Sequence, residues 1–144
     1  MNNCIFCNIE EDLIVHEYNH FYVIRDAFQV TPLHSLIITK RHVVSYFQCS
    51  QEEHDEIPIV LDTLKTEFKI LDESITGFNI GMNIGKDAGQ TIFHCHIHII
   101  PRRQGDTPNP KGGVRGVSTE AKILTFVLSF DLCYFFLLFQ VPPY

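Results

Sequence analysis

The stretch FHCHIHIIPRR, residues 93–103, places three of the chain's eight histidines at every second position. Side chains alternate between the faces of a β-strand, so His94, His96 and His98 are expected to share one face while the residues between them point into the core. Same-face neighbours lie about 6.6 Å apart, close enough for two imidazoles to contact one phosphate. This pattern has three possible interpretations: a solvated strand face, a metal site, or a site in which a histidine attacks phosphorus. Three histidines in five residues argue against the first, and spacing alone does not separate the other two.

The loop just before these histidines carries groups that suit a phosphate. GKDAGQT, residues 85–91, contains Gly85 and Gly89, which let backbone amides approach an anion closely. Gln90 and Thr91 add an amide and a hydroxyl as donors. A glycine-rich loop alone is a weak signal, but its position directly before three alternating histidines favours phosphate chemistry.

Composition and charge limit the class of protein. The 144 residues are 45% hydrophobic and 19% charged, which is typical of one globular domain. A net charge of −6 argues against a nucleic-acid partner. The N-terminus lacks the pattern of a secretory signal, and five cysteines cannot all pair within one chain. We therefore expect a cytoplasmic protein whose cysteines are thiols or metal ligands.

Residue patterns predict several strands and one long helix. The helix is expected over 50–74, opened by a capping box between Ser50 and Glu53, with Pro58 kinking it or delaying its regular part. The expected strands are HFYVIRDA (20–27), SLIITK (35–40), GFNIGMNIG (77–85) and IFHCHIHII (92–100). Strands dominate without regular β–α–β alternation, so the sequence predicts an α+β domain built on an antiparallel sheet.

The segment NIGKDAGQTIFHCHIHIIPRR, residues 83–103, resembles the signature of the histidine triad (HIT) superfamily. FYVIRDAFQVTPLHSLIITKRH, residues 21–42, is similar to the strand–turn–strand segment of the same family. The likeness covers residues 4 to about 122 and points to bacterial HIT hydrolases that resemble diadenosine tetraphosphate hydrolases. It implies a HIT-like antiparallel sheet of about five strands, one long helix and a short one. It also implies a homodimer across which the sheet continues, with a HIT domain over residues 1–122.

The resemblance assigns expected roles to individual residues. His96 matches the nucleophile that attacks the α-phosphorus, and His98 matches the residue that contacts the phosphate and bridging oxygens. His34 matches a fourth histidine of the same pocket, and Asp26 matches the acid that binds the ribose hydroxyls. The phosphate-binding set corresponds to Asn83, Gly89, Gln90 and Thr91, and the base-binding slot corresponds to Ile5, Phe6, Ile9, Ile24 and Ala27.

A metal site is the second expectation. Cys4 and Cys7 form a C-x-x-C pair, which in an intracellular chain indicates half a zinc site or a redox pair. The family resemblance implies a structural zinc held by this pair together with His42 and His94. The alternative is two buried thiols and a surface histidine. The resemblance implies no organic cofactor.

The expected activity is that of a nucleotide hydrolase or transferase acting at an α-phosphate. A dinucleoside polyphosphate of the diadenosine tetraphosphate type is the first expected substrate, with release of a nucleoside monophosphate. Three alternatives stay open: a purine nucleotide-binding or sensing module with little turnover, a nucleoside phosphoramidate hydrolase, and a metalloenzyme with catalytic zinc on all three triad histidines.

The C-terminal tail, residues 123–144, departs from the family pattern because it is almost entirely apolar. Ile123–Val141 is marginally long enough to span a bilayer, although Asp131 opposes insertion by roughly 3 kcal/mol. The tail could instead be a segment buried against a partner subunit, or an end with no selected role. Membrane contact is the less favoured of these interpretations.

Overall fold

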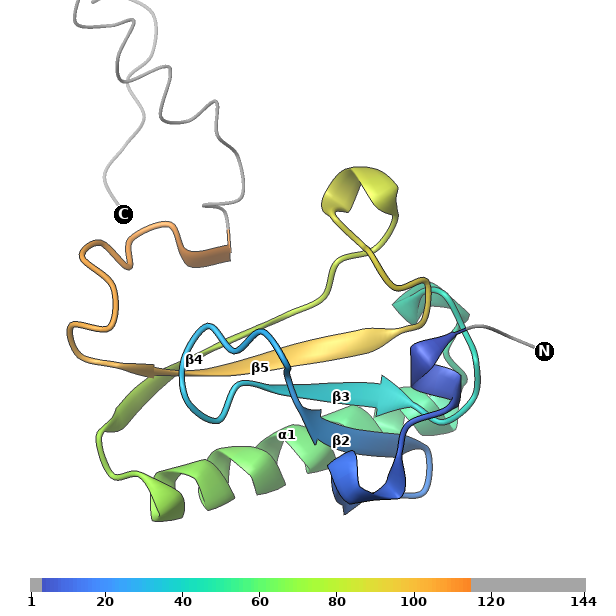
Figure 1. The fold of residues 1–144 in the computed structure, drawn as a ribbon, viewed down its shortest axis with the longest axis horizontal. Coiled ribbons are helices and arrows are strands. Elements are labelled where there is room, and N and C mark those ends of the chain that lie inside the picture. Colours follow the sequence, from blue (N-terminus) through green and yellow to red (C-terminus); the bar gives the residue numbers. More distant parts are fainter. Residues whose placement is uncertain (1–3, 115–144) are drawn as a thin grey trace, which may run out of the picture. The chain divides into compact units, whose positions relative to one another are not determined.

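The computed structural model describes residues 4–114, in which five strands form one antiparallel sheet with the order β1-β2-β3-β5-β4 (Figure 1). The strands are β1 (Ile14–Glu17), β2 (Phe21–Arg25), β3 (Ser35–Thr39), β4 (Ile75–Gly81) and β5 (His96–Arg103), and the helix is α1 (Gln51–Leu71). Short 3-10 turns lie at Ile5–Cys7, Glu11–Leu13, Tyr46–Gln48 and Lys86–Ala88. The predicted α+β domain with a five-stranded antiparallel sheet is confirmed.

The N-terminus of α1 is closed by the predicted capping box. The Ser50 hydroxyl accepts from the Glu53 amide at 3.3 Å, and the Glu53 carboxylate accepts from the Ser50 amide at 2.7 Å. The helix begins at Gln51 and continues through Pro58, so the proline does not delay its regular part. Pro58 lies on the exposed side of the helix, where solvent can reach the carbonyl that it leaves without a donor.

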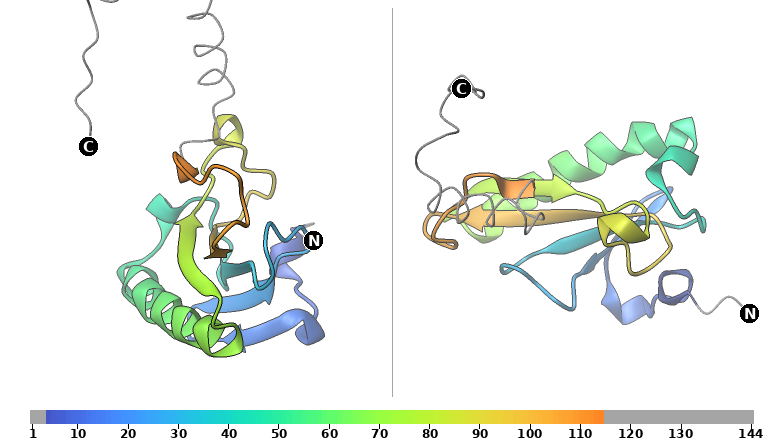
Figure 2. Two further views of the ribbon diagram at one scale, coloured as in Figure 1. Left: turned by 90° about the vertical axis from the view of Figure 1, so that its left-hand side faces the viewer. Right: turned by 90° about the horizontal axis from the view of Figure 1, so that it is seen from above.

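The main core lies between α1 and one face of the sheet (Figure 2). Its buried residues are Phe21, Val23, Ile37, Val60, Leu64, Phe68, Ile75, Ile97 and Ile99. Each buried methylene contributes roughly 0.8 kcal/mol, so this cluster fixes which face of β5 meets the helix. Because Ile97 and Ile99 alternate with His96 and His98 on β5, burying the isoleucines turns both histidines to the other face.

The central position of β5 determines which residues surround His96 and His98 on the face of the sheet away from α1. β5 lies between β3 and β4, with His96 opposite Ile38 and His98 opposite Leu36 on β3. The two histidines therefore stand in the middle of the sheet, flanked by apolar side chains, and not at an exposed edge.

The triad strand differs from its predicted range of 92–100. The His94 amide donates to the Ile92 carbonyl at 2.8 Å in a tight turn, and the Cys95 amide donates to the Val43 carbonyl at 2.6 Å. These bonds delay the strand, so β5 begins at His96 and His94 precedes it.

Other elements also differ from the predictions. β4 begins and ends earlier than expected, and β1 was not predicted individually because its four residues carry no distinctive pattern. The predicted short helix has no α-helical counterpart within residues 4–114; the segments concerned form 3-10 turns of three residues each.

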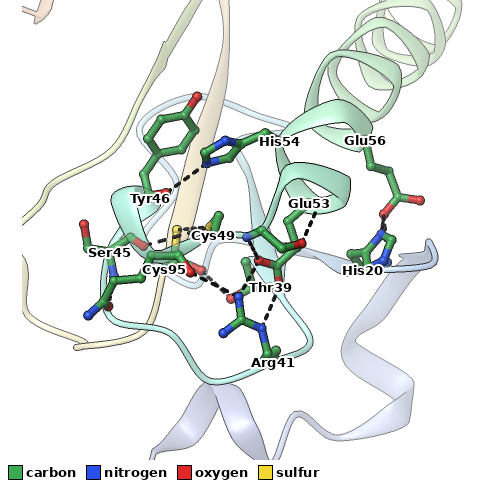
Figure 3. A network of polar contacts seen from close by, with 12 residues as sticks. His20, Thr39, Arg41, Ser45, Tyr46, Cys49, Glu53, His54, Glu56 and Cys95 are labelled. Carbon is green, nitrogen blue, oxygen red and sulfur yellow. Dashed lines mark hydrogen bonds and ion pairs between the residues drawn. The ribbon is translucent and has the colours of Figure 1, made fainter.

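An ion pair between a buried carboxylate and an exposed guanidinium joins the start of α1 to the segment after β3 (Figure 3). Glu53 is only 2% exposed, and its carboxylate accepts from Arg41 Nη2 at 2.8 Å and from Arg41 Nε at 3.3 Å. Burial raises the pKa of Glu53, but the bonds from Arg41 and from the Ser50 amide outweigh burial and lower it below its usual value. The carboxylate therefore stays ionised and holds residue 41 against the helix.

Replacing this carboxylate should reveal its contribution to stability. Glu53→Gln should lower the free energy of unfolding at neutral pH by about 2 kcal/mol, because hydrogen bonds to a charged group are the stronger ones. A lowered pKa stabilises the fold above the unfolded glutamate pKa of roughly 4.3 and loses this effect as the pH falls. Urea denaturation should therefore show a smaller difference between wild type and variant in acid. Glu73→Gln, at an exposed site, is the control, and an equal loss at both pH values would contradict the ionic role.

The chain divides into two units after Asn109, and residues 110–114 are described by themselves. In that short segment the Gly113 amide donates to the Pro110 carbonyl at 3.1 Å. The predicted domain boundary at residue 122 and the apolar tail at 123–144 lie outside the described residues. Within residues 4–114, no helix has the length and apolarity needed to cross a membrane.

Candidate active site

His96 presents one particular ring nitrogen for chemistry. The residue is 8% exposed, and its Nδ1 lies 2.7 Å from the backbone carbonyl oxygen of His94. A carbonyl can only accept, so Nδ1 carries the proton and Nε2 keeps its lone pair. The Phe6 ring meets the imidazole edge-on with the ring centroids 5.1 Å apart. This arrangement fixes the ring and leaves Nε2 able to act as a nucleophile.

His98 receives a hydrogen bond from His34 and so presents the complementary nitrogen. His34 Nδ1 accepts from the backbone amide of Val30 at 3.2 Å, so the proton of a neutral His34 resides on Nε2. That Nε2–H donates a hydrogen bond to His98 Nδ1 at 3.0 Å. The proton of His98 then resides on Nε2, where it is available as a donor. The rings of His96 and His98 are 5.2 Å apart between centroids, so a lone pair and an N–H donor stand side by side.

Asp26 lies beside this pair of imidazoles. Its Oδ2 is 3.4 Å from His34 Nε2 and 3.6 Å from His98 Nδ1, and its Oδ1 accepts from the Phe28 amide at 2.8 Å. Burial, and next the neighbouring imidazoles of His96 and His34, lower the pKa of His98 to about 4, although Asp26 opposes the shift. Burial also lowers the pKa of His34. Both rings are therefore neutral at neutral pH.

A metal on Asp26, His34 and His98 does not fit this hydrogen bonding, although their ligand atoms lie within 4.8 Å of one another. The Val30 amide occupies the Nδ1 lone pair of His34 and leaves Nε2 protonated, whereas a metal needs a lone pair there. Among the described residues, no group of candidate ligands joins all three triad histidines. The geometry therefore disfavours the alternative of catalytic zinc on the triad.

A second group of candidate ligands consists of Cys4, Cys7, His42 and His94. His94 Nε2 lies 2.7 Å from the Thr39 carbonyl, so Nε2 is the protonated nitrogen and Nδ1 has the lone pair. That Nδ1 is 3.4 Å from Cys4 Sγ, 3.6 Å from Cys7 Sγ and 3.2 Å from His42 Nδ1. Ligands of a tetrahedral zinc would be separated by roughly 3.3–3.8 Å, given its usual bond lengths. The two thiols and two imidazoles gather with spacings that suit such a metal.

The loop before the triad combines glycines of positive φ with exposed polar groups. Gly85 has φ +86° and Gly89 has φ +83°, a region that side chains disfavour. Asn83 and Thr91 are exposed, and Asn83 Nδ2 donates to the Gly89 carbonyl at 3.5 Å. Both glycines therefore adopt a conformation that a side chain would strain, and the amides of Gly85, Ala88, Gly89 and Gln90 donate within the loop.

Gln90 has a different environment from the one that its expected phosphate contact would require. It is 4% exposed, and its Oε1 accepts from the Gly85 amide at 2.8 Å. Its Nε2 donates to the carbonyls of Val44 at 2.8 Å and Ile92 at 3.2 Å. All of these partners are backbone groups, so the side chain braces the loop and does not offer its amide to a ligand.

The expected base-binding residues separate into two groups. Phe6, Leu36 and Ile38 form a small buried cluster against which Cys4, Ile9, Ile24 and Ile92 pack. Phe6, Ile9 and Ile24 are thus together on the histidine face of the sheet. Ile5 is 61% exposed and lines a separate cavity, and Ala27 is exposed in the turn after β2.

Comparison with known proteins identifies the family. The family model of the HIT domain matches residues 8–105 of this chain. The chain belongs to the HIT family. An uncharacterized 16.1 kDa HIT-like protein of Mycoplasma pneumoniae is 35% identical to this HIT protein over 107 residues, which cover 70% of this chain and 72% of that one. A zinc-bound histidine triad family protein of Mycobacterium smegmatis has a similar structure, with a TM-score of 0.65, 28% identity and coverage of 86% of this chain and 97% of that one.

Two further relatives of this HIT protein have a named activity. Adenylylsulfatase HINT3 of Arabidopsis thaliana is 34% identical over 115 residues, covering 73% of this chain and 55% of that protein. A diadenosine triphosphate hydrolase of Plasmodium falciparum has a TM-score of 0.64 and 26% identity, covering 84% and 79% of the respective chains. This HIT protein belongs with the nucleotide hydrolases and transferases of its family.

The sequence did not indicate the backbone partners that orient the imidazoles. The Val30 amide, the Thr39 carbonyl and the His94 carbonyl are common to every residue type, so no side-chain pattern reveals them. The turn signal in QVTPLH, residues 29–34, is the only sequence feature that points to the first of them.

The protonation of His98 can be measured directly. NMR of labelled imidazole nitrogens should show His98 neutral, with its proton on Nε2, down to about pH 5, whereas an ordinary imidazole with a pKa near 6.5 is largely protonated there. His34→Ala should allow both neutral tautomers of His98, with the proton on Nδ1 or on Nε2, because the donor to Nδ1 is lost. His54→Ala, which removes a ring on α1, should leave the His98 signals unchanged. A wild-type His98 with its proton on Nδ1 would contradict the proposed hydrogen bonding.

Proposed function

We propose that this HIT protein cleaves a phosphoric anhydride bond at the α-phosphate of a nucleotide through a covalent nucleotidyl-His96 intermediate. The observation that carries the proposal is the pairing of a buried His96, whose Nε2 has a lone pair, with a neutral His98 whose Nε2 has a proton. One ring supplies the attacking group and the other supplies a donor for the charge that develops on oxygen. A dinucleoside polyphosphate of the diadenosine tetraphosphate type is the first substrate to test.

The first step forms a bond between His96 Nε2 and the α-phosphorus while the bond to the bridging oxygen breaks. The imidazole becomes positively charged, and its Nδ1–H remains bonded to the His94 carbonyl, which stabilises that charge. His98 Nε2–H donates a hydrogen bond to the departing bridging oxygen. In this proposal the exposed Thr91 hydroxyl donates to a non-bridging oxygen, since the amides of Gly85, Ala88, Gly89 and Gln90 already donate within the loop.

The second step returns the enzyme to its starting state. A water oxygen bonds to the α-phosphorus, the Nε2–P bond breaks, and its electron pair returns to His96. The water loses one proton to solvent, and a nucleoside monophosphate is released. In this proposal Asp26 binds the ribose hydroxyls, and Phe6, Ile9 and Ile24 hold the base.

The neutral state of His98 in the free protein favours a polyphosphate over the amine of a phosphoramidate as the leaving group. A polyphosphate departs as an anion and needs only a hydrogen bond, whereas an amine must receive a proton. With a pKa of about 4, His98 is a hydrogen-bond donor and a poor source of protons at neutral pH. The diadenosine triphosphate hydrolase among the similar structures supports the same choice.

We further propose a structural zinc on Cys4, Cys7, His42 and His94, a donor set of two thiols and two imidazoles. The zinc would cross-link the N-terminal turn to the residue before β5, and it would take no part in bond breaking. We also propose a cytoplasmic homodimer whose subunits join along the edge strand β4. Pairing two such edges would leave no row of unpaired backbone groups on β4.

The nucleophile assignment is tested by removing the imidazole. His96→Gly should lower kcat for diadenosine tetraphosphate by roughly a thousandfold or more while changing the Kd of the nucleotide only a few-fold, because the ring acts mainly in the transition state. Quenching wild type and a radiolabelled substrate in alkaline denaturant should trap an adenylyl group on His96, because a histidine N–P bond is stable in base and labile in acid. His54→Ala should retain wild-type turnover. Tight binding by wild type without turnover would instead identify a sensing module, and a fully active His96→Gly would exclude this nucleophile.

The metal proposal is tested by elemental analysis of protein purified without a histidine tag. One zinc per chain is expected, and Cys4→Ser should reduce it well below half an equivalent because one of four ligands is lost. Cys49→Ser is the matched control, since this thiol lies outside the ligand group. A wild-type protein with less than half an equivalent, after dialysis against micromolar zinc, would refute the site.

A further inference from the structure

A cavity of about 410 Å³ lies between the N-terminal turn and the segment that follows the 85–91 loop. Its lining residues are Cys4, Ile5, His42, Val44, Thr91, Ile92 and Phe93. None of Ile9, Ile24 and Asp26, the residues proposed to hold the first nucleoside, lines it. The cavity therefore borders the proposed base slot at Cys4 and Ile92 but does not include the residues that would hold the first nucleoside.

The cavity adjoins the reacting groups through two of its lining residues. Thr91 belongs to the loop proposed to bind the phosphate, and Ile92 packs against the cluster of Phe6, Leu36 and Ile38. The Phe6 ring in turn contacts His96. A substrate bonded at its α-phosphorus to His96 could therefore extend past Thr91 into this cavity.

The chemistry of the lining suits a flat and largely apolar group. Phe93 is 49% exposed and Ile5 is 61% exposed, and Val44 and Ile92 add branched aliphatic surface. No lysine, arginine, aspartate or glutamate lines the cavity, so it has no group that would pair with a phosphate. An exposed phenyl ring next to aliphatic side chains offers a stacking surface for a nucleobase, while Cys4 and His42 on the same wall belong to the proposed zinc site.

We infer that this cavity binds the base of the second nucleoside, the one that departs with the polyphosphate. The inference rests on the proposed function, because it presumes a substrate with a nucleoside at each end. It deepens that function by assigning a binding site to the departing nucleoside, which a mononucleoside polyphosphate lacks. Phe93 is the specificity-determining residue in this assignment.

Two substrates with the same scissile bond separate this cavity from the rest of the site. Diadenosine tetraphosphate and adenosine tetraphosphate share the adenosine, the α-phosphate and the chain of four phosphates, and they differ only in the second nucleoside. Phe93→Ala should lower kcat/KM for the dinucleotide about tenfold, the effect of losing one base–aromatic stack, and leave the mononucleotide unchanged. Phe93→Tyr should restore the dinucleotide rate because it keeps the ring.

Phe47→Ala is the control, since Phe47 is 81% exposed and lies outside the cavity lining. Zinc content should be equal in all variants, which checks that the change at 93 does not disturb the adjacent His94. Equal losses for both substrates would overturn the inference, because the cavity would then hold the first nucleoside or act only on structure. No loss for either substrate would also overturn it.

Binding measurements keep this test independent of turnover. In the His96→Gly background, Phe93→Ala should weaken the Kd of the dinucleotide about tenfold and leave that of the mononucleotide unchanged. This difference would support the second-base site even if wild type hydrolysed neither compound, an outcome that would refute the proposed function alone. Equal affinities with and without the phenyl ring would refute the second-base site even in an active enzyme.

Discussion

Backbone carbonyl groups decide which nitrogen the first two histidines of the triad present. The Thr39 carbonyl holds the Nε2–H of His94, and the His94 carbonyl holds the Nδ1–H of His96. Because a carbonyl can only accept, each bond assigns the proton to one nitrogen and the lone pair to the other. His94 therefore directs Nδ1 toward two cysteines, while His96 keeps Nε2 for a reaction. Two histidines of one repeating pattern acquire different chemistry in this way.

His94 connects the candidate metal cluster to the candidate nucleophile. Its ring faces Cys4, Cys7 and His42, and its carbonyl orients His96. A displacement of the ring would therefore move the group that assigns the His96 proton. This shared residue gives a physical reason for a cross-link at the N-terminus to matter to a reaction at the start of β5, without any role in the chemistry itself.

Buried polar groups away from the reacting atoms hold the supporting segments in position. Glu53 ties Arg41, the neighbour of His42, to the first turn of α1 (Figure 3). Gln90 ties the 85–91 loop to the Val44 and Ile92 carbonyls. A buried carboxylate or amide is stable only when its hydrogen bonds are made, so each of these side chains specifies one arrangement of the chain around it. The site is thus supported by side chains whose hydrogen bonds are made within the protein.

The sequence by itself determined the α+β class, the helix cap at Ser50, the alternation that turns His96 and His98 away from the core, and the family. These features depend on local periodicity and on motifs, which a linear pattern records. Only the tertiary structure decided that His94 leaves the strand, that Gln90 bonds to backbone, that Ile5 lines a different cavity from Ile9, and that His34 assigns the His98 proton. Each of these depends on contacts between residues far apart in the chain, often with backbone groups that every residue carries, and no spacing of side chains along one sequence contains that information.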